Sequence, residues 1–356
     1  MLSVRTLAFG FALLAAPAAH AAPGMDTVSR AVDGFVRPAY AALAESTEKL
    51  AETVDALCKA PSPQALEAAR QGFAAAVDAW SEAEIIRFGP VTYQNRLERL
   101  LFWPDRKGIG LKQVQGALAD HDPAAADPAG LAGKSVAMQG FGALEFVLFG
   151  TGAETLAGAA EPYRCAYGLA IARNIAGIAR DVRTAWEDPQ GFRATWEKPH
   201  TGNQVYRDET EAVTELMEVF INGLEMIRDV RLKGFLGETA DADKPRQAIY
   251  WRSGRTAQSV AHNLSAMRAL FDASRLGEAL PADQDWLAGS IRFEFANAAR
   301  AAEGAAGPVA EALGDPERRQ KFAYLLIVTT SLSELFGTKL ADAFGLTAGF
   351  SSLDGD

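Results

Sequence analysis

The stretch SPQALEAARQGFAAAVDAW, residues 62–80, decides the fold class. Ser62 followed by Pro63 is typical of a helix start, because serine caps free backbone N–H groups and proline suits the first helical position. Apolar side chains then recur at steps of three and four residues, at Leu66, Ala69, Phe73, Val77 and Trp80. This spacing places them on one side of an α-helix, so the stretch predicts a long helix with one buried face.

Similar patterns fill most of the remaining chain. Helical periodicity extends over residues 28–57, 134–148, 163–186, 209–233, 255–271, 282–302 and 316–335. Pro38 is expected to disturb the first of these segments. Alternation with a period of two and clusters of β-branched residues are scarce, which argues against strands. The sequence therefore predicts an all-α fold of about eight major helices, arranged as two four-helix-bundle-like domains packed side by side.

The N-terminal end has the features of a secretory signal peptide. Arg5 precedes an apolar run from Leu7 to Ala19, and Ala19-His20-Ala21 matches an A-x-A cleavage pattern. The run is too short to span a bilayer. We expect residues 1–22 to be removed on export to the periplasm, leaving a protein that does not span the membrane. An N-terminal helical bundle, residues 23–200, and a C-terminal helical bundle, residues 201–356, would follow.

Charge and cysteine content narrow the class of protein further. Without the signal peptide, 34 basic residues face 45 acidic ones. This acidic balance argues against nucleic-acid binding. It is compatible with attraction of cations, but simple solubility is the favoured interpretation. Cys58 and Cys165 are the only cysteines. In an exported chain they fit one disulfide, and two buried thiols are the alternative.

One acidic residue interrupts the most apolar segment of the chain. Glu145 ends the sequence GFGALE, residues 140–145, inside the apolar run 138–149. Burying a lone carboxylate is costly, so Glu145 must be paired, hydrogen-bonded or functional. Gly142 lies one turn earlier on the same helix face and leaves access for backbone or ligand. Two interpretations stay open: a structural glutamate paired with an arginine, and a ligand or acid–base group in an interdomain cleft.

The segment around residues 88–113 supplies candidate partners for Glu145. Arginines alternate there with acids, namely Arg87, Arg96, Arg99 and Arg106 with Glu82, Glu84, Glu98 and Asp105. Guanidinium groups pair with carboxylates in bidentate fashion. Long ordered loops are also often functional. The segment is interpreted either as a site wall that holds an anionic group or as an ion-paired clamp between two helices. The candidate ligand-binding residues are Gly140, Gly142, Glu145, Arg87, Arg96, Glu98 and Asp105.

A second charged segment, KPRQAIYWRSGR at residues 244–255, mixes aromatic and cationic side chains before a helix. It is interpreted as a recognition surface or, equally, as arginine stacking on an aromatic ring in a domain-joining segment. Histidines are scarce after processing, with only His121, His200 and His262 remaining. None belongs to HExxH or to an i, i+3 pair with glutamate. No GxSxG or phosphate-binding glycine loop is present. The sequence assigns no catalytic residue and no metal-ligand set.

The chain resembles the imelysin-like family, exported bacterial proteins named for an insulin-cleaving peptidase. The resemblance covers nearly the whole mature chain and rests on Arg87–Pro90, Asn95–Arg99, Phe102–Gly108, Gln139–Gly150 and Gly349–Asp356. In the family signature GxHxxE, Gly140 and Glu145 match, whereas Gly142 stands at the histidine position. The metal-binding domain of EfeO-type iron-uptake proteins, a related branch, shares the HxxE pair.

This resemblance implies an all-α fold of two bundle-like domains with a site between them. Some members are linked to iron uptake or regulation, and others were described as metallopeptidases. Because the presumed metal-binding histidine is missing, we expect a non-enzymatic binding protein linked to acquisition of iron or another divalent metal, with envelope iron-uptake proteins as partners. One alternative is an imelysin-type metallopeptidase that recruits His262. Another is a structural partner of an envelope uptake system, in which Glu145 is only a buried ion-pair member.

Overall fold

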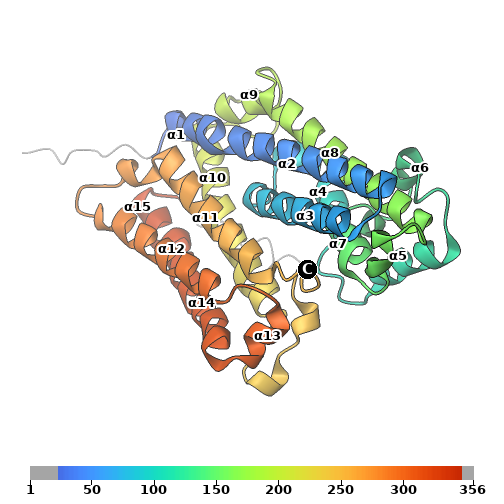
Figure 1. The fold of residues 1–356 in the computed structure, drawn as a ribbon. Helices are drawn as coiled ribbons and strands as arrows, with labels where there is room; N and C mark the ends of the chain where they lie inside the picture. The colour runs from blue at the N-terminus through green and yellow to red at the C-terminus, as the bar shows by residue number, and fades with distance from the viewer. Residues whose placement is uncertain (1–22, 347–356) are drawn as a thin grey trace, which may run out of the picture.

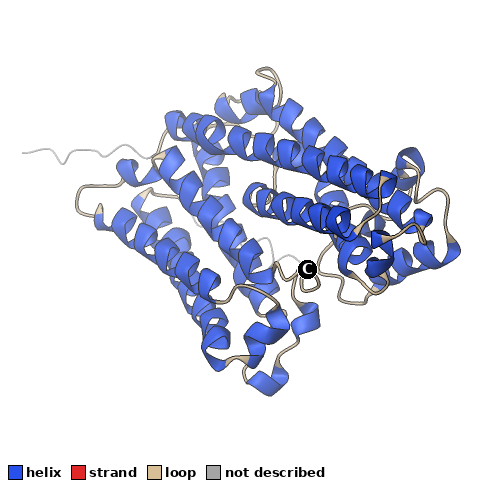
Figure 2. Cartoon of the chain, viewed as in Figure 1, coloured by secondary structure: helices blue, strands red, loops and turns tan. Residues whose placement is uncertain are grey.

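The computed structural model describes residues 23–346, and all regular structure in that range is helical (Figure 2). The predicted all-α fold is confirmed. No helix within residues 23–346 is both long and apolar enough to cross a membrane. The expected signal peptide, residues 1–22, and the C-terminal motif Gly349–Asp356 lie outside the described residues.

The chain begins with three helical segments that continue one another. These are α1 (Met25–Ala31), a π-helical turn η1 (Val32–Val36) and α2 (Arg37–Lys59). Pro38 lies in the first turn of α2. Proline is tolerated in a first turn, because the N–H group it lacks has no partner within the helix there. The expected disturbance therefore takes the form of the π-helical turn just before Pro38.

Two long helices pack against α2 (Figure 1). They are α3 (Pro63–Ala83) and α8 (Pro162–Glu187). Ser62 caps α3 as predicted, since its hydroxyl accepts from the Ala65 N–H at 3.1 Å. The segment between them forms the shorter helices α4 (Arg96–Leu100), α5 (Ile109–Asp120), α6 (Pro128–Ala132) and α7 (Phe141–Phe149). A further short helix, α9 (Phe192–Glu197), follows α8.

The second half of the chain is again helical. Its elements are α10 (Glu209–Glu225), a π-helical turn η5 (Met226–Leu232), α11 (Thr256–Ser274), α12 (Trp286–Gly304), α13 (Val309–Gly314), α14 (Pro316–Glu334), a π-helical turn η9 (Leu335–Leu340) and α15 (Ala341–Ala343). Short 3-10 turns lie at 89–95, 136–138, 153–157, 240–242, 245–247 and 276–279. Helix α12 packs against both α11 and α14 (Figure 1).

The two halves share an extensive contact. Helix α3 packs on α11, and α1 packs on both α10 and α11. Buried apolar residues from both halves form one continuous cluster, which includes Phe73, Trp80 and Phe141 as well as Phe220 and Phe271. The division into bundles of residues 23–200 and 201–356 stays a prediction. A site between the two halves would therefore lie among helices that are already packed together, such as α3 and α11.

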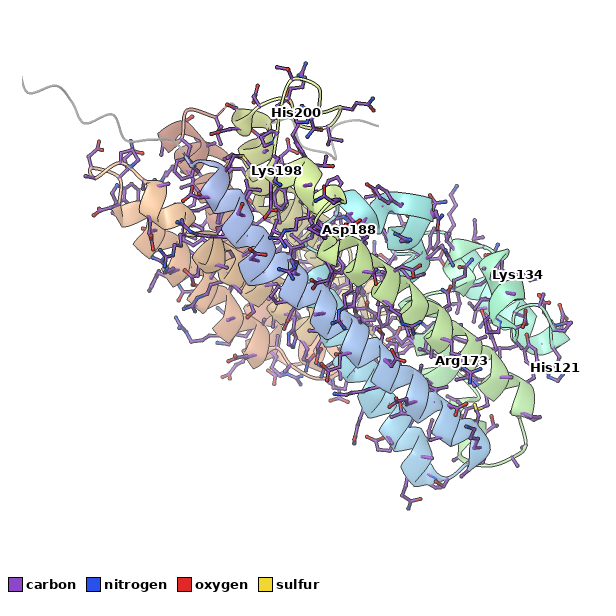
Figure 3. The ribbon with its side chains drawn as sticks, turned by 90° about the horizontal axis from the view of Figure 1, so that it is seen from above. His121, Lys134, Arg173, Asp188, Lys198 and His200 are labelled. Atoms are coloured by element: carbon purple, nitrogen blue, oxygen red, sulfur yellow. A yellow bond between two sulfur atoms is a disulfide. The ribbon has the colours of Figure 1, made fainter. Side chains whose placement is uncertain are left out.

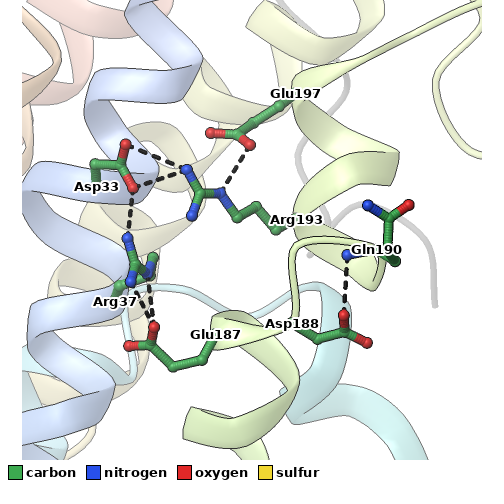
Figure 4. A network of polar contacts seen from close by, with 7 residues as sticks. All are labelled: Asp33, Arg37, Glu187, Asp188, Gln190, Arg193 and Glu197. Atoms are coloured by element: carbon green, nitrogen blue, oxygen red, sulfur yellow. Dashed lines mark hydrogen bonds and ion pairs between the residues drawn. The ribbon is translucent and has the colours of Figure 1, made fainter.

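Helices α2 and α8 are joined at both ends. Cys58, near the end of α2, forms a disulfide with Cys165 at the start of α8, with Cα atoms 5.5 Å apart. At the opposite end, Arg37 of α2 pairs with Glu187 of α8 at 2.5 Å and with Asp33 at 2.7 Å (Figure 4). Arg193 extends this network by pairing with Asp33 at 3.0 Å. These links hold the two longest helices of the first half in register.

Candidate functional site

Helix α7, which carries Glu145, begins later than its apolar pattern predicted. A helix was expected over 134–148, but residues 136–138 form a 3-10 turn and α7 begins at Phe141. Gly140 explains the break. A Cβ atom there would lie 2.2 Å from the carbonyl oxygen of Leu100. The backbone of α4 thus approaches the start of α7 too closely for any other residue at position 140.

The other end of α7 is bound by two arginines. Arg164 of α8 donates to the carbonyl oxygens of Phe146, Val147 and Thr151, each at 3.0 Å. Arg70 of α3 donates to a further carbonyl oxygen of the same turn at 3.0 Å. The last carbonyl groups of a helix lack partners within the helix and carry partial negative charge, so cations there are stabilising.

The entry to α7 is also held by side chains. Tyr167 donates to the carbonyl of Met138 at 2.9 Å, and Asn174 donates to that of Gln139 at 3.0 Å. Arg99 donates to the Gln139 side chain at 2.8 Å. With both ends bound, α7 is a fixed platform, and the position of Glu145 is set by α3, α4 and α8 together.

The Glu145 side chain is buried and hydrogen-bonded across the two halves of the chain. Only 4% of the residue is exposed. Its Oε1 accepts from the Ser253 N–H at 2.9 Å and from the Ser253 hydroxyl at 2.8 Å. Burial raises the pKa of Glu145, and the two Ser253 hydrogen bonds and the charge of Arg252 oppose this shift. Glu145 therefore joins α7 to the segment that precedes α11.

The segment around residues 88–113 was a possible source of the partner of Glu145. The hydrogen-bond partner in the structure is instead Ser253. The Arg96 side chain lies 3.6 Å from Asp181, and Asp105 accepts from two N–H groups at the start of α5, at 2.9 and 3.0 Å. Glu98 and Arg87 are exposed. A ligand role for Arg87, Arg96, Glu98 and Asp105 stays a prediction.

Gly142 occupies the histidine position of the family signature, one turn before Glu145. It is exposed, and a Cβ atom built on it would meet no heavy atom within 4 Å. A side chain at this position would therefore point into open space. Gly140 and Gly142 thus differ: Gly140 is required by backbone packing, whereas Gly142 is sterically free.

Residues 245–255, which contact Glu145 through Ser253, bring two arginines against one tryptophan ring. The guanidinium carbon of Arg252 lies 4.4 Å from the centre of the Trp251 ring, and that of Arg246 lies 6.0 Å from it. Arg252 also lies 5.3 Å from the ring of Phe146 on α7. Such distances are typical of cation–π contacts. We call these three residues, Arg246, Trp251 and Arg252, the cation–aromatic cluster.

A buried ion pair lies nearby, where α3 meets η5 and α11. Glu84 and Arg231 pair at 2.6 Å, and each side chain is 1% exposed. Arg231 also donates to Ser259 at 2.8 Å, and Asn263 donates to Glu84 at 2.9 Å. These extra hydrogen bonds offset part of the cost of desolvating both charges. The group links residues that are 147 positions apart in the chain.

His262 lies on the same contact between α3 and α11. Its Nδ1 is 2.8 Å from Glu82, and its Nε2 is 3.6 Å from Asp78, which also pairs with Arg255. The hydrogen bond to Glu82 raises the pKa of His262. The two ring nitrogens thus face different carboxylates. Within residues 23–346, no group of three or more His, Cys, Asp and Glu residues has the arrangement of a metal site.

The other two histidines are far from each other. Figure 3 places His200 at the upper edge of the molecule and His121 at its right-hand end. His121 stacks near Tyr163, with ring centres 4.9 Å apart. His200 accepts a hydrogen bond from the Gly202 N–H at 3.1 Å. These local contacts account for both histidines.

The comparison with known families identifies the group to which the protein belongs. Residues 36–337 match the family model for imelysin. The chain belongs to the imelysin family. The matched range includes α3, α7 and α11 and therefore both sides of the Glu145–Ser253 contact.

Several relatives of this imelysin-family protein are known. Iron-regulated protein A of Synechococcus elongatus is 24% identical over 222 residues, which cover 61% of this chain and 56% of the relative. The structure of an imelysin-like protein from Psychrobacter arcticum 273-4 superposes with a TM-score of 0.73 at 19% identity, covering 92% of this chain and 97% of the other. A structure from Parabacteroides distasonis ATCC 8503, described as an iron-regulated protein A precursor, gives a TM-score of 0.69 at 15% identity, with coverages of 88% and 95%. These structures show the same fold.

Proposed function

We propose that the mature chain is exported to the periplasm and acts in iron acquisition as a non-enzymatic binding protein. Its ligand site lies where α7 meets residues 245–255. Envelope iron-uptake proteins are the partners to which it would pass its ligand. The signal-peptide pattern of residues 1–22 supports export. Two similar proteins are described as iron-regulated protein A or its precursor, and this supports the link to iron.

One observation carries the non-enzymatic part of this proposal. Glu145, the acid of the family signature, accepts both the N–H and the hydroxyl of Ser253. A general base must lie within reach of the proton that it abstracts, and here Glu145 is only 4% exposed and its carboxylate is held to Ser253 through Oε1. With a glycine at the histidine position, the signature here provides a positioning acid and no adjacent imidazole.

The proposal is tested in a bacterial strain from which the gene has been deleted. We expect slower growth and reduced uptake of radioactive iron under iron limitation, both restored by the wild-type gene. The mature protein should appear in the periplasmic fraction, with a mass that lacks residues 1–22. Normal iron uptake in the deleted strain would contradict the proposal.

Peptidase activity is the main alternative and has its own test. The purified protein is incubated with a mixture of fluorogenic peptides, with and without a chelator. We expect no cleavage above that of a heat-inactivated sample. Chelator-sensitive cleavage that disappears in Glu145→Ala would establish the metallopeptidase instead.

A structural role in an envelope uptake system is a second candidate, and the burial of Glu145 favours it. The two functions differ in ligand binding. If the protein is a structural partner, its gene should restore iron uptake in the deleted strain, whereas the purified protein should show no saturable binding of iron salts or iron chelates in calorimetry. If it is a binding protein, the gene should restore uptake and the purified protein should also bind iron or an iron chelate.

A further inference from the structure

We propose that the cation–aromatic cluster of Arg246, Trp251 and Arg252 is a binding site for a carboxylate-bearing anion, and that iron reaches this protein as the anionic ferric chelate of such a compound. This inference rests on the proposed function and names the class of ligand. It specifies the form in which the expected iron would be bound.

The first observation is that two like charges are held close together. Arg246 and Arg252 both contact Trp251. Burial lowers the pKa of Arg252, the charge of Glu145 raises it, and the charge of Arg246 lowers it. Neither arginine belongs to an ion pair within residues 23–346, although most arginines of this acidic chain do. Two guanidinium groups that contact the same ring without an ion-pair partner repel each other, and an anion that contacts both would reduce this repulsion.

The second observation is that the fold fixes this arrangement. Ser253, next to Arg252, is bonded to Glu145 on the rigid helix α7. Tyr250, next to Trp251, is 3% exposed and has a left-handed backbone with φ of 54°. Such a conformation is strained for a non-glycine residue and persists only where the surroundings impose it. Thr256 closes the turn by donating to the carbonyl of Ile249 at 2.6 Å.

The third observation concerns what the site would recognise. Guanidinium groups bind carboxylates through two parallel hydrogen bonds, and both arginines retain solvent access, Arg246 being exposed and Arg252 partly buried. Glu145 is the nearby acid, but burial raises its pKa and its Oε1 is engaged by Ser253, which weakens its repulsion of an anion. Ferric ion is a hard cation that takes oxygen ligands, so its polycarboxylate chelates present suitable groups.

The test is calorimetric titration of the full mature protein with ferric citrate and, separately, with trisodium citrate. We expect saturable binding of both, weakened by added salt because exposed charges are screened. Arg246→Ala and Arg252→Ala should each weaken binding about tenfold, the usual effect of losing one charge-assisted hydrogen-bonded contact. Arg246→Ala is the safer variant for folding, because its side chain is exposed.

Arg292→Ala is the matched control. Arg292 also lies over an aromatic ring, 5.4 Å from that of Phe271, but it is neutralised by Asp272 at 2.7 Å. Its removal should leave citrate binding unchanged. Equal affinities of the wild type and the Arg246→Ala/Arg252→Ala double variant would overturn the inference, as would binding of citrate without binding of its ferric chelate.

The failure of this inference can be told apart from failure of the proposed function. If the deleted strain has the iron-uptake defect but the purified protein binds neither form of citrate, only the ligand class is wrong. If the protein binds ferric citrate through Arg246 and Arg252 but the deleted strain takes up iron normally, the anion site stands and the role in iron acquisition falls.

Discussion

At the scale of single residues, the molecule assigns Glu145 a role that its sequence left open. Both open interpretations assumed a charged partner or a ligand, and the structure supplies a serine 108 positions away. The cost of burying the carboxylate predicted that a partner must exist. The identity of that partner could not be predicted, because Ser253 gives no signal of its own within KPRQAIYWRSGR.

The Glu145–Ser253 contact can be measured by substitution. Glu145→Ala leaves the Ser253 donors without their acceptor, and we expect a loss of roughly 1–3 kcal/mol in the free energy of unfolding. Glu145→Gln keeps one acceptor oxygen and should lose less. A double-mutant cycle with Ser253→Ala, followed by urea unfolding, should show coupling between the two sites. Strictly additive losses would mean that the contact contributes nothing to stability.

His262 gives a prediction about pH. Its pKa is raised in the folded state, so the folded protein binds its proton more tightly than the unfolded chain does. The stabilisation is full below the unfolded pKa of about 6.5 and is lost as pH rises through the higher folded value. Asp78, Glu82 and Arg255 are the charged groups that face the ring.

We therefore expect His262→Gln to lower the melting temperature more at pH 5.5 than at pH 9. Thermal unfolding of both proteins across this range is the measurement. A difference that stayed constant with pH, or grew toward pH 9, would show that the imidazolium is not what stabilises this contact.

At the scale of elements, periodicity predicted most helices to within a few residues, because one buried face repeats at helical spacing. The segment from 163 to 186 became α8, Pro162–Glu187, and that from 255 to 271 became α11, Thr256–Ser274. The start of α7 was mispredicted, because an all-apolar segment shows no change in hydrophobic periodicity that would mark where a helix begins. The helix begins only at Phe141 because α4, which lies about 40 residues earlier in the chain, approaches the backbone at Gly140.

Gly140 and Gly142 provide a matched pair of substitutions in α7. Gly140→Ala brings a methyl group against backbone at Leu100, which cannot yield, so we expect a loss of about 1–3 kcal/mol. Gly142→Ala adds a methyl group in open space inside a helix and should be neutral or stabilise by up to about 1 kcal/mol. The midpoint of urea unfolding measures both. Equal effects would contradict the assigned close contact.

At the scale of the whole molecule, the two halves of the chain share an apolar core, and the buried Glu84–Arg231 ion pair lies within their contact. The all-α class could be predicted from composition and pattern, and the export signal stays a prediction. The Glu84–Arg231 pair could not be predicted, because Arg231 lies in the π-helical turn η5 and meets Glu84, at the end of α3, only through the packing of the two halves of the chain. Long-range pairing of this kind leaves no local trace in a single sequence.

Breaking this pair should destabilise the whole protein. Arg231→Met leaves Glu84 buried without its cation, and we expect a loss of roughly 3–5 kcal/mol. Adding Glu84→Gln removes the unpaired charge and should recover part of the loss. Urea unfolding of the two variants is the measurement. A double variant less stable than Arg231→Met alone would contradict this account of the contact.

Whether iron is bound as an anionic chelate where α7 meets residues 245–255 can be tested most directly by anomalous diffraction at the iron absorption edge, using crystals of the mature protein grown with ferric citrate. We expect an iron peak beside Trp251, with citrate oxygens bonded to Arg246 and Arg252. A peak bound directly by Asp78, Glu82 or His262, or iron absent from the cation–aromatic cluster, would contradict it.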